Sequence, residues 1–378
     1  MARASKWRDR LGNFALLAST MALTLLAIEY AFRFSLGTSF VLFPRNHAAA
    51  QYGEFVLRRM VPNAVFRHQS ADGRWKFKTN NKGFRDERDY AYEKSPNAFR
   101  VLVLGDSHTA GFEVHQHEVF THVLENSLRE RGINAEVLNT GISGFGTAEH
   151  LAYLEQEGLR YQPDAVVLAF FGNDYSDSAR SGLYKLEGGK LTEVSRQYAP
   201  AVDIIRFVNA VPGLKWLGEN SYAYSYLFNA VWDFVKAWSV RRATMQVNDT
   251  SNQKEYAVPV GAVSTAEENL VAALIKRAGE LARRHKITTI LVDIPGTDNS
   301  NDIVPSLQVK TRQVAVQAFD HVIESHQYLQ DRPVGQLVHV PHGHRHISAY
   351  THRRLGETLA QVLTTEGGIR ASTSTARP

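Results

Sequence analysis

Residues 101–114 read VLVLGDSHTAGFEV, and this stretch decides the fold. A short run of Val and Leu that ends in a glycine predicts a buried strand. Gly105, Asp106, Ser107 and His108 follow at once, so the strand delivers a hydroxyl and an imidazole at its carboxyl end. Ligands of open parallel sheets bind at that end of the strands. The stretch therefore predicts either a plain turn or a nucleophile mounted on the edge of a sheet.

The chain after residue 98 keeps alternating between strand-like and helix-like patterns. Strands are predicted at 99–105, 135–141, 164–172, 287–296 and 335–341. Helices are predicted at 118–132, 147–159, 265–285, 309–326 and 348–365, with Thr147 as a cap of the second. Strands that alternate with helices of this length imply right-handed crossovers and an α/β fold, a parallel sheet in a three-layer α/β/α arrangement.

Composition excludes several classes of protein. The 378 residues, 44% of them hydrophobic, suit one large domain with additions or two modest domains. The net charge of +5 comes without a dense basic block among aromatics, so we expect no nucleic-acid partner. The chain has no cysteine, which excludes disulfides, thiolate metal sites and cysteine nucleophiles.

The amino terminus predicts a membrane anchor. The first ten residues carry four basic side chains, Arg3, Lys6, Arg8 and Arg10. An apolar run starts at Phe14 and is interrupted at Glu29, close to the ~17–25 residues that cross a bilayer as a helix. Basic flanks stay in the cytoplasm. We expect a cytoplasmic leader at 1–12, a transmembrane signal anchor at 13–35 in the inner membrane, and the remainder outside the cytoplasm.

Two other interpretations of this segment stay open. One is a buried core helix, which the basic leader at the very start disfavours. The other is a cleaved signal peptide, but Glu29 and Arg33 stand where a site of small residues would be needed. These two side chains, four residues apart, are expected to pair at the membrane interface.

Four further segments are expected. Residues 36–97 form an extracytoplasmic lead-in in which SADGRW predicts a tight turn between short strands, and 98–364 form the main domain.

An aromatic interval at about 175–262 breaks the alternation of strands and helices. We expect a helical insertion that packs on the flank of the sheet; a lid over the site, or aromatics resting on the membrane, are the alternatives. The polar tail at 365–378 is expected to be disordered.

The predicted strand ends deliver one consistent set of chemical groups. The second strand ends in NTGISGFGT, with Asn139, Gly141 and Gly144, the third ends in Gly172-Asn173-Asp174, and PHGHRHIS follows the last. A serine hydroxyl needs an imidazole to accept its proton, and a tetrahedral intermediate needs donors for its oxyanion. Glycine amides and an Asn side chain are such donors. The set is what acyl transfer requires.

These motifs resemble four of the sequence blocks of the SGNH (GDSL) hydrolase superfamily, namely the first, second, third and fifth. VLVLGDSHTAGFEV is similar to the first block, LNTGISGFGT to the second, FFGNDYSD to the third, and HISAYTHRRLGETLA to the block that carries the histidine. The blocks occur in the family's order over about residues 98–362. The anchor together with TNNKGFRDERDY resembles membrane-tethered members of bacterial envelope systems. The resemblance implies a parallel, flavodoxin-like SGNH hydrolase sheet.

The resemblance also implies roles for single residues. Ser107 would be the nucleophile and His346 the general base and acid. The amides of Ser107 and Gly144 and the side chain of Asn173 would form the oxyanion hole. From its place next to the nucleophile, and not from the resemblance, His108 is expected to line the substrate pocket or else to be a plain turn histidine. We expect no cofactor.

Further polar residues near these blocks receive simpler interpretations. His342, His344 and His346 alternate, which also suits a metal, but no carboxylate or fourth ligand accompanies them and we expect none. His352 is expected on the last helix as a solvated or capping residue. Asp174 is expected to stabilise its loop.

One departure from the family pattern concerns the acid that orients the histidine. The family usually places an Asp three residues before it, where this chain has Gly343. Three explanations compete: a backbone carbonyl that orients His346 in a Ser–His dyad, which we prefer, a distant carboxylate such as Asp331, or a degenerate site. Asp106 is expected to support the nucleophile turn.

The expected function is therefore that of a membrane-anchored serine esterase. It would act through an acyl-Ser107 intermediate on an O-acylated glycan or lipid of the cell envelope. The alternatives are a polysaccharide O-acyltransferase that uses the same site and a catalytically silent carbohydrate-binding protein of the same fold. Acyl group, acceptor and oligomeric state cannot be told from the sequence.

Overall fold

The structure is a computed structural model of the chain. It describes residues 2–37, 40–42, 46–200, 202–231, 234, 263–296 and 301–365. The predicted tail and the last part of the predicted insertion lie outside the described residues.

A parallel sheet of five strands forms the centre of the molecule, in the order β12-β11-β7-β5-β6. Its strands are β5 (Phe99–Leu104), β6 (Ala135–Asn139), β7 (Ala165–Phe170), β11 (Thr288–Asp293) and β12 (His321–Ile323). Because β5 lies between β6 and β7, the carboxyl ends of these three strands are neighbours on one edge. The predicted α/β fold with a parallel sheet is confirmed.

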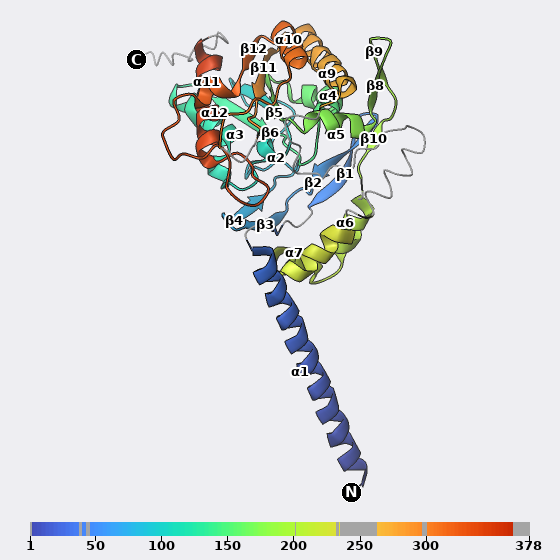
Figure 1. The fold of residues 1–378 in the computed structure, drawn as a ribbon. Helices are drawn as coiled ribbons and strands as arrows, with labels where there is room; N and C mark the ends of the chain where they lie inside the picture. The colour runs from blue at the N-terminus through green and yellow to red at the C-terminus, as the bar shows by residue number, and fades with distance from the viewer. Residues whose placement is uncertain are drawn as a thin grey trace.

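Helices cover both faces of this sheet (Figure 1). One face packs against α4 (Thr147–Gln156), α5 (Asp174–Ser181), α9 (Thr265–Arg284) and α10 (Val309–Ala318). The other packs against α3 (Phe120–Glu130), α11 (Ser325–Leu329) and α12 (Ala349–Thr365). Side chains of β5 alternate between the two cores: Leu102 and Leu104 enter the first, Val101 and Val103 the second. The arrangement has the three layers that the sequence predicts.

The lead-in forms two small antiparallel pairs beside the main sheet. The strands β1 (His47–Tyr52) and β2 (Phe55–Met60) pair with each other, and β3 (Val65–Ser70) pairs with β4 (Gly73–Lys78). The second pair is the predicted hairpin at SADGRW.

The predicted insertion contains strands as well as helices. It begins with α5 and continues with a hairpin of β8 (Tyr184–Glu187) and β9 (Lys190–Glu193). A short strand β10 (Gln197–Tyr198) then runs parallel to β2, and α6 (Val202–Ala210) and α7 (Leu214–Asn220) follow. Residues 222–231 are helical as well. The insertion therefore pairs with the lead-in through β10 and β2, a strand pair that the aromatic composition of the insertion did not predict.

The first helix, α1 (Ala2–Leu36), projects from the globular body as a single rod, with α6 and α7 beside its carboxyl end (Figure 1). Its segment Arg10–Leu36 is long and apolar enough to cross a membrane, and no part of it is buried inside the protein. The alternative of a buried core helix is therefore wrong. Length and composition fit both an anchor and a signal sequence.

Three predicted elements differ from the structure. The predicted helix at 309–326 ends at Ala318, and the edge strand β12 and the start of α11 follow, because His321–Ile323 pair with β11. The predicted strand at 335–341 is reduced to a single bridge between His339 and Ile347. Thr147 is the first residue of α4 rather than its cap, which is Gly146.

Candidate active site

The nucleophile turn lies where β5 ends. Asp106 caps the short helix α2 (Ser107–Ala110), and its carboxylate accepts a hydrogen bond from the amide of His108 at 2.9 Å. The side chain of Asn139, at the end of β6, donates to the carbonyl of Thr109 at 2.8 Å. Asp106 thus supports the nucleophile turn, and the side chain of Asn139 holds this turn against the end of β6.

The imidazole of His346 reaches the hydroxyl of Ser107. The distance between Nε2 and Oγ is 2.9 Å, although the two residues are 239 positions apart. Both are almost fully buried, with exposures of 3% for His346 and 7% for Ser107. His346 lies in the loop between α11 and α12. The bridge between His339 and Ile347 and a hydrogen bond from the amide of Val340 to the carbonyl of His346 hold the backbone of this loop. A base and a nucleophile in this contact can activate the hydroxyl.

The other imidazole nitrogen contacts a carboxylate that the sequence analysis missed. Nδ1 of His346 lies 3.0 Å from Oε2 of Glu113. The same carboxylate accepts the backbone amides of His344 and His346, each at 3.1 Å. The prediction of a backbone carbonyl at this position is wrong, and the alternative Asp331 is exposed. Glu113 is the last but one residue of the stretch 101–114, and an acid between the apolar Phe112 and Val114 was the signal that could have found it.

Gly343 leaves the space that Glu113 fills. A Cβ at this position would lie 2.0 Å from Oε1 of Glu113, and its φ of +64° belongs to the left-handed region that favours glycine. Glu113 itself has a φ of 65°, which few residues of its type adopt. The acid therefore belongs to the loop that follows the nucleophile. Position 343, where the family usually has an Asp, has no room for a side chain beside Glu113.

The lead-in holds the loop that carries Glu113. Arg85 donates to the carbonyls of Ala110, Gly111 and Val114 along this loop, and its guanidinium lies 3.7 Å from the centre of the Phe77 ring.

The hairpin β3–β4 reaches the same loops from the other side. Nε2 of His68 lies 3.7 Å from Oε1 of Glu113, and both side chains are completely buried. Asp72, in the turn of the hairpin, accepts hydrogen bonds from the amide and from Nδ1 of His342 at 3.0 and 2.7 Å. The segment before the main domain thus completes the surroundings of the acid.

The electrostatics keep Glu113 ionised. Burial alone raises the pKa of its carboxyl, but the hydrogen bond from His346 and the nearby ring of His68 outweigh burial and lower that pKa well below its usual range. Burial lowers the pKa of His68 and of His108, so both rings favour the neutral form. A fixed negative charge therefore faces Nδ1 of His346.

The predicted oxyanion donors follow the two strands that flank β5. Gly144 follows β6 with a φ of +74°, and Arg58 from β2 packs against it and donates to the carbonyl of Ser143 at 2.8 Å. Asn173 follows β7 and is the residue before the first turn of α5. Gly144 and Asn173 thus follow the two strands that lie on either side of β5, the strand that carries Ser107 at its end.

His108 has a structural contact at the site. Its ring is buried, packs at 4.1 Å from the ring of Phe171, and accepts a hydrogen bond on Nδ1 from the amide of Ile347 at 3.3 Å. It therefore ties the nucleophile turn to the loop of His346.

The remaining predicted residues have other partners. His344 lies with its ring 6.2 Å from that of His68, and the alternating histidines do not converge on one point, since His342 turns to Asp72. His352 is buried, not solvated, and its Nδ1 accepts the first amide of α3 at 3.2 Å. Asp174 accepts the hydroxyl of Thr147 at 2.9 Å.

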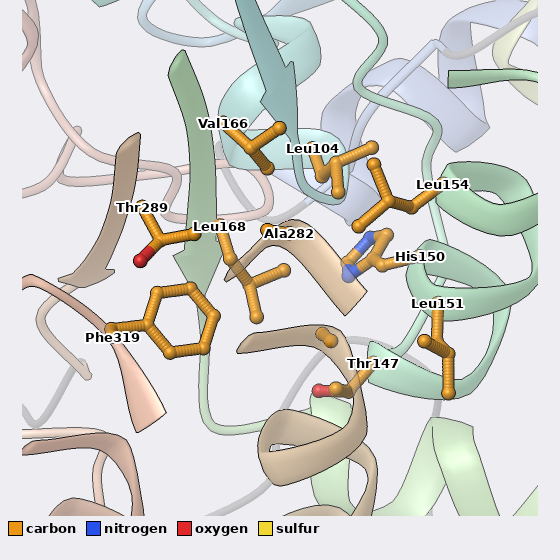
Figure 2. A pocket seen from close by; sticks show the side chains of 11 residues that line it. Leu104, Thr147, His150, Leu151, Leu154, Val166, Leu168, Ala282, Thr289 and Phe319 are labelled. Atoms are coloured by element: carbon orange, nitrogen blue, oxygen red, sulfur yellow. The ribbon is translucent and has the colours of Figure 1, made fainter. Parts of the chain in front are cut away.

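A cavity elsewhere in the core is lined by none of the predicted catalytic residues. Figure 2 shows it between the sheet and the helices α4 and α9, lined by His150, Leu104, Leu168 and Phe319 among others. Burial lowers the pKa of His150 to about 3, so this ring is neutral. An apolar lining and a neutral imidazole give the cavity no chemistry of its own.

Comparisons with known proteins agree with the motifs. The model of the GDSL-like lipase/acylhydrolase family matches residues 103–354. An arylesterase from Vibrio mimicus is 36% identical over 75 residues, which are 20% of this chain and 38% of that protein, so the match spans well under half of the relative. The solved structure of TesA covers 70% of this chain and 97% of its own, at 15% identity and a TM-score of 0.37. A lipase/acylhydrolase from Enterococcus faecalis covers 71% and 96%, at 15% identity and a TM-score of 0.38.

Proposed function

The chain belongs to the GDSL-like lipase/acylhydrolase family, and on that premise we propose that it hydrolyses esters through an acyl-Ser107 intermediate. The observation that carries the proposal is the continuous contact from Oγ of Ser107 through the ring of His346 to the carboxylate of Glu113. A hydroxyl, an imidazole and an orienting acid in this order are the parts of a serine hydrolase triad.

The first half of the reaction forms the acyl-enzyme. Ser107 Oγ attacks the ester carbonyl while Nε2 of His346 takes the hydroxyl proton. The carbonyl oxygen becomes an oxyanion, for which the amides of Ser107 and Gly144 and the side chain of Asn173 are the donors. The tetrahedral intermediate then breaks its bond to the alcohol oxygen, and His346 returns the proton to that oxygen. Alcohol leaves, and the acyl group remains on Ser107.

The second half repeats these steps with water. His346 takes a proton from a water molecule, which attacks the acyl carbonyl of Ser107. The new intermediate expels the serine oxygen, which recovers its proton from His346. A carboxylic acid is released and the free enzyme is restored.

Glu113 acts on the base and not on the substrate. Its carboxylate accepts a hydrogen bond from Nδ1 of His346, which fixes the tautomer whose Nε2 can take the serine proton. Its charge also stabilises the imidazolium that forms in each half of the reaction. The silent carbohydrate-binding alternative rested mainly on the missing Asp, and Glu113 removes that support.

The substrate belongs to the cell envelope in this proposal. The helix α1 anchors the chain in the inner membrane, and the domain with Ser107 lies on the periplasmic side. The hairpin β3–β4, which contacts Glu113, lies near the carboxyl end of α1 (Figure 1). An O-acylated glycan or lipid close to the membrane surface is the substrate class that fits this position. Transfer of the acyl group to a glycan hydroxyl instead of water is the second candidate, because the acyl-enzyme serves both reactions.

The test is turnover of a short-chain aryl ester and of an O-acetylated glycan by the full chain in detergent micelles. Release of acid that disappears in Ser107→Ala is the expected result, and equal turnover in both proteins would refute the proposal. An added unacylated glycan that becomes acylated would assign the transferase reaction.

A further inference from the structure

The carboxyl end of α1 fixes the height of the membrane surface along the protein. Residues 11–28 carry no charged side chain. A helix of that length extends about 27 Å, close to the ~30 Å of a bilayer's hydrocarbon core. Glu29 and Arg33 follow and form an ion pair at 2.8 Å. The outer interface therefore lies at the level of these two side chains.

The insertion binds the protein's anchor at this level. The carboxylate of Glu29 accepts the hydroxyl of Ser221 at 2.7 Å and the amides of Tyr222 and Ala223 at 2.9 and 3.1 Å, and so caps the helix at 222–231. Arg33 donates to the carbonyl of Asn220, at the end of α7, at 2.8 Å.

Aromatic contacts strengthen the same junction. The rings of Phe32 and Tyr226 lie 5.1 Å apart, and the guanidinium of Arg33 lies 5.1 Å from the centre of the Tyr222 ring. The beginning of this helix is therefore held where headgroups surround α1.

Large apolar side chains of the insertion remain exposed beside this junction. Leu227, Val231 and Phe234 are 59%, 62% and 72% exposed, and the spacing of four residues places Leu227 and Val231 on one face of the helix at 222–231. Trp216 on α7 is 63% exposed and Phe207 on α6 is 68% exposed. We call these five side chains the insertion face. Single exposed apolar side chains are common on protein surfaces, whereas several of them gathered on one part of the surface mark a contact with a partner.

We propose that the insertion face lies in the outer headgroup region of the bilayer, so that the protein contacts the membrane with an interfacial surface in addition to α1. Continuity with the anchor selects lipid as the partner, because Glu29 and Arg33 hold this part of the insertion at the height of the interface. Tryptophan and other apolar side chains on helices that lie flat are suited to that region. The proposal rests on the anchor in the proposed function, and it fixes the orientation of the domain above the membrane.

The chain has no cysteine, so single-cysteine variants allow a direct test. The full protein is reconstituted into vesicles of phosphatidylethanolamine and phosphatidylglycerol, with bimane attached at Trp216→Cys, Leu227→Cys, Leu17→Cys or Val316→Cys. Leu17 lies in α1, and Val316 is 56% exposed on α10, at the opposite end of the globular body from α1 (Figure 1). Each labelled protein must retain the thermal midpoint of the wild type.

The measurement is the loss of bimane fluorescence when nitroxide lipids are included, with the nitroxide near the headgroup for positions 216, 227 and 316 and in the middle of the acyl chain for position 17. We expect at least twofold quenching at positions 17, 216 and 227 and almost none at 316. Quenching at 17 with none at 216 and 227 would overturn the interfacial contact and leave the anchor intact. If position 17 also escapes quenching, both the anchor and the interfacial contact are wrong.

Discussion

Oε2 of Glu113 lies 3.0 Å from Nδ1 of His346, although the acid comes from the loop behind the nucleophile and not from the loop of the histidine. One strand end, that of β5, therefore supplies both Ser107 and the acid. The histidine arrives from a segment more than 200 residues later and fits between them. The triad is thus built from two loops, and the lead-in residues Arg85 and His68 hold the loop of the acid.

Glu113→Gln tests the role of the acid. A neutral amide cannot stabilise imidazolium and can donate to Nδ1, which favours the wrong tautomer. We expect kcat for an aryl ester to fall by about 100- to 10,000-fold with little change in KM. The control is Glu118→Gln, since the side chain of Glu118 accepts a hydrogen bond from the amide of His115 and is not a hydrogen-bond partner of His346. Equal loss of kcat in both variants would contradict the assignment.

Moving the acid to the family's usual position is a sharper test. Gly343→Asp alone is expected to lower activity, because its Cβ would meet Oε1 of Glu113 at 2.0 Å. In the Glu113→Ala background that space is free, so the new carboxylate has room beside His346. Asp also tolerates the left-handed backbone better than most residues.

The double-mutant cycle gives the readout. We expect the kcat of Glu113→Ala with Gly343→Asp to exceed that of Glu113→Ala by about tenfold or more, a difference of about 1.4 kcal/mol in activation free energy. The coupling between the two substitutions is larger than this value by the loss that Gly343→Asp causes alone. If the losses in kcat from the two single substitutions simply add in the double variant, a carboxylate at position 343 does not replace that of Glu113 beside His346.

Asn173→Ala tests the oxyanion hole. Loss of one donor to the developing charge typically costs about 100- to 1,000-fold in kcat. Asn173 also stands at the start of α5, so thermal unfolding is measured in parallel. We expect the loss in kcat with a thermal midpoint within a few degrees of the wild type. A kcat within threefold of the wild type would remove Asn173 from the site.

Regular elements and the nucleophile motif could be predicted from sequence because each depends on local signals. The Val-Leu run of β5, the glycine that ends it and the apolar face of α9 are visible within a few residues. The partner of Nδ1 could not be predicted, because Glu113 and Gly343 are complementary only after the chain folds. The edge strand β12 was missed for the same reason, since its three residues gain strand structure only by pairing with β11.

A buried carboxyl on α4 predicts a pH dependence of stability. Burial, and next the charge of Asp177, raises the pKa of Glu149 from 4.5 to about 8. The folded state then keeps this proton to higher pH than the unfolded chain, so the free energy of unfolding falls as pH rises from about 4.5 to about 8. Glu149→Gln keeps an oxygen for the amide of Gly146 and does not titrate. We expect its gain in thermal midpoint over the wild type to be larger at pH 8 than at pH 5.

The matched control for that pH test is the exposed Glu280→Gln on α9. Its thermal midpoint should follow that of the wild type at both pH values. Parallel curves for Glu149→Gln and the wild type would contradict the raised pKa.

The account's central claim is a nucleophilic Ser107 activated by His346 and Glu113, and the most direct test is covalent labelling by a fluorophosphonate. The full chain is incubated with the reagent, and intact mass and peptide mapping locate the adduct. We predict one adduct on Ser107, a rate of labelling at least tenfold lower in Glu113→Gln, and no adduct in Ser107→Ala. An adduct on another residue, or equal labelling of wild type and Ser107→Ala, would contradict it.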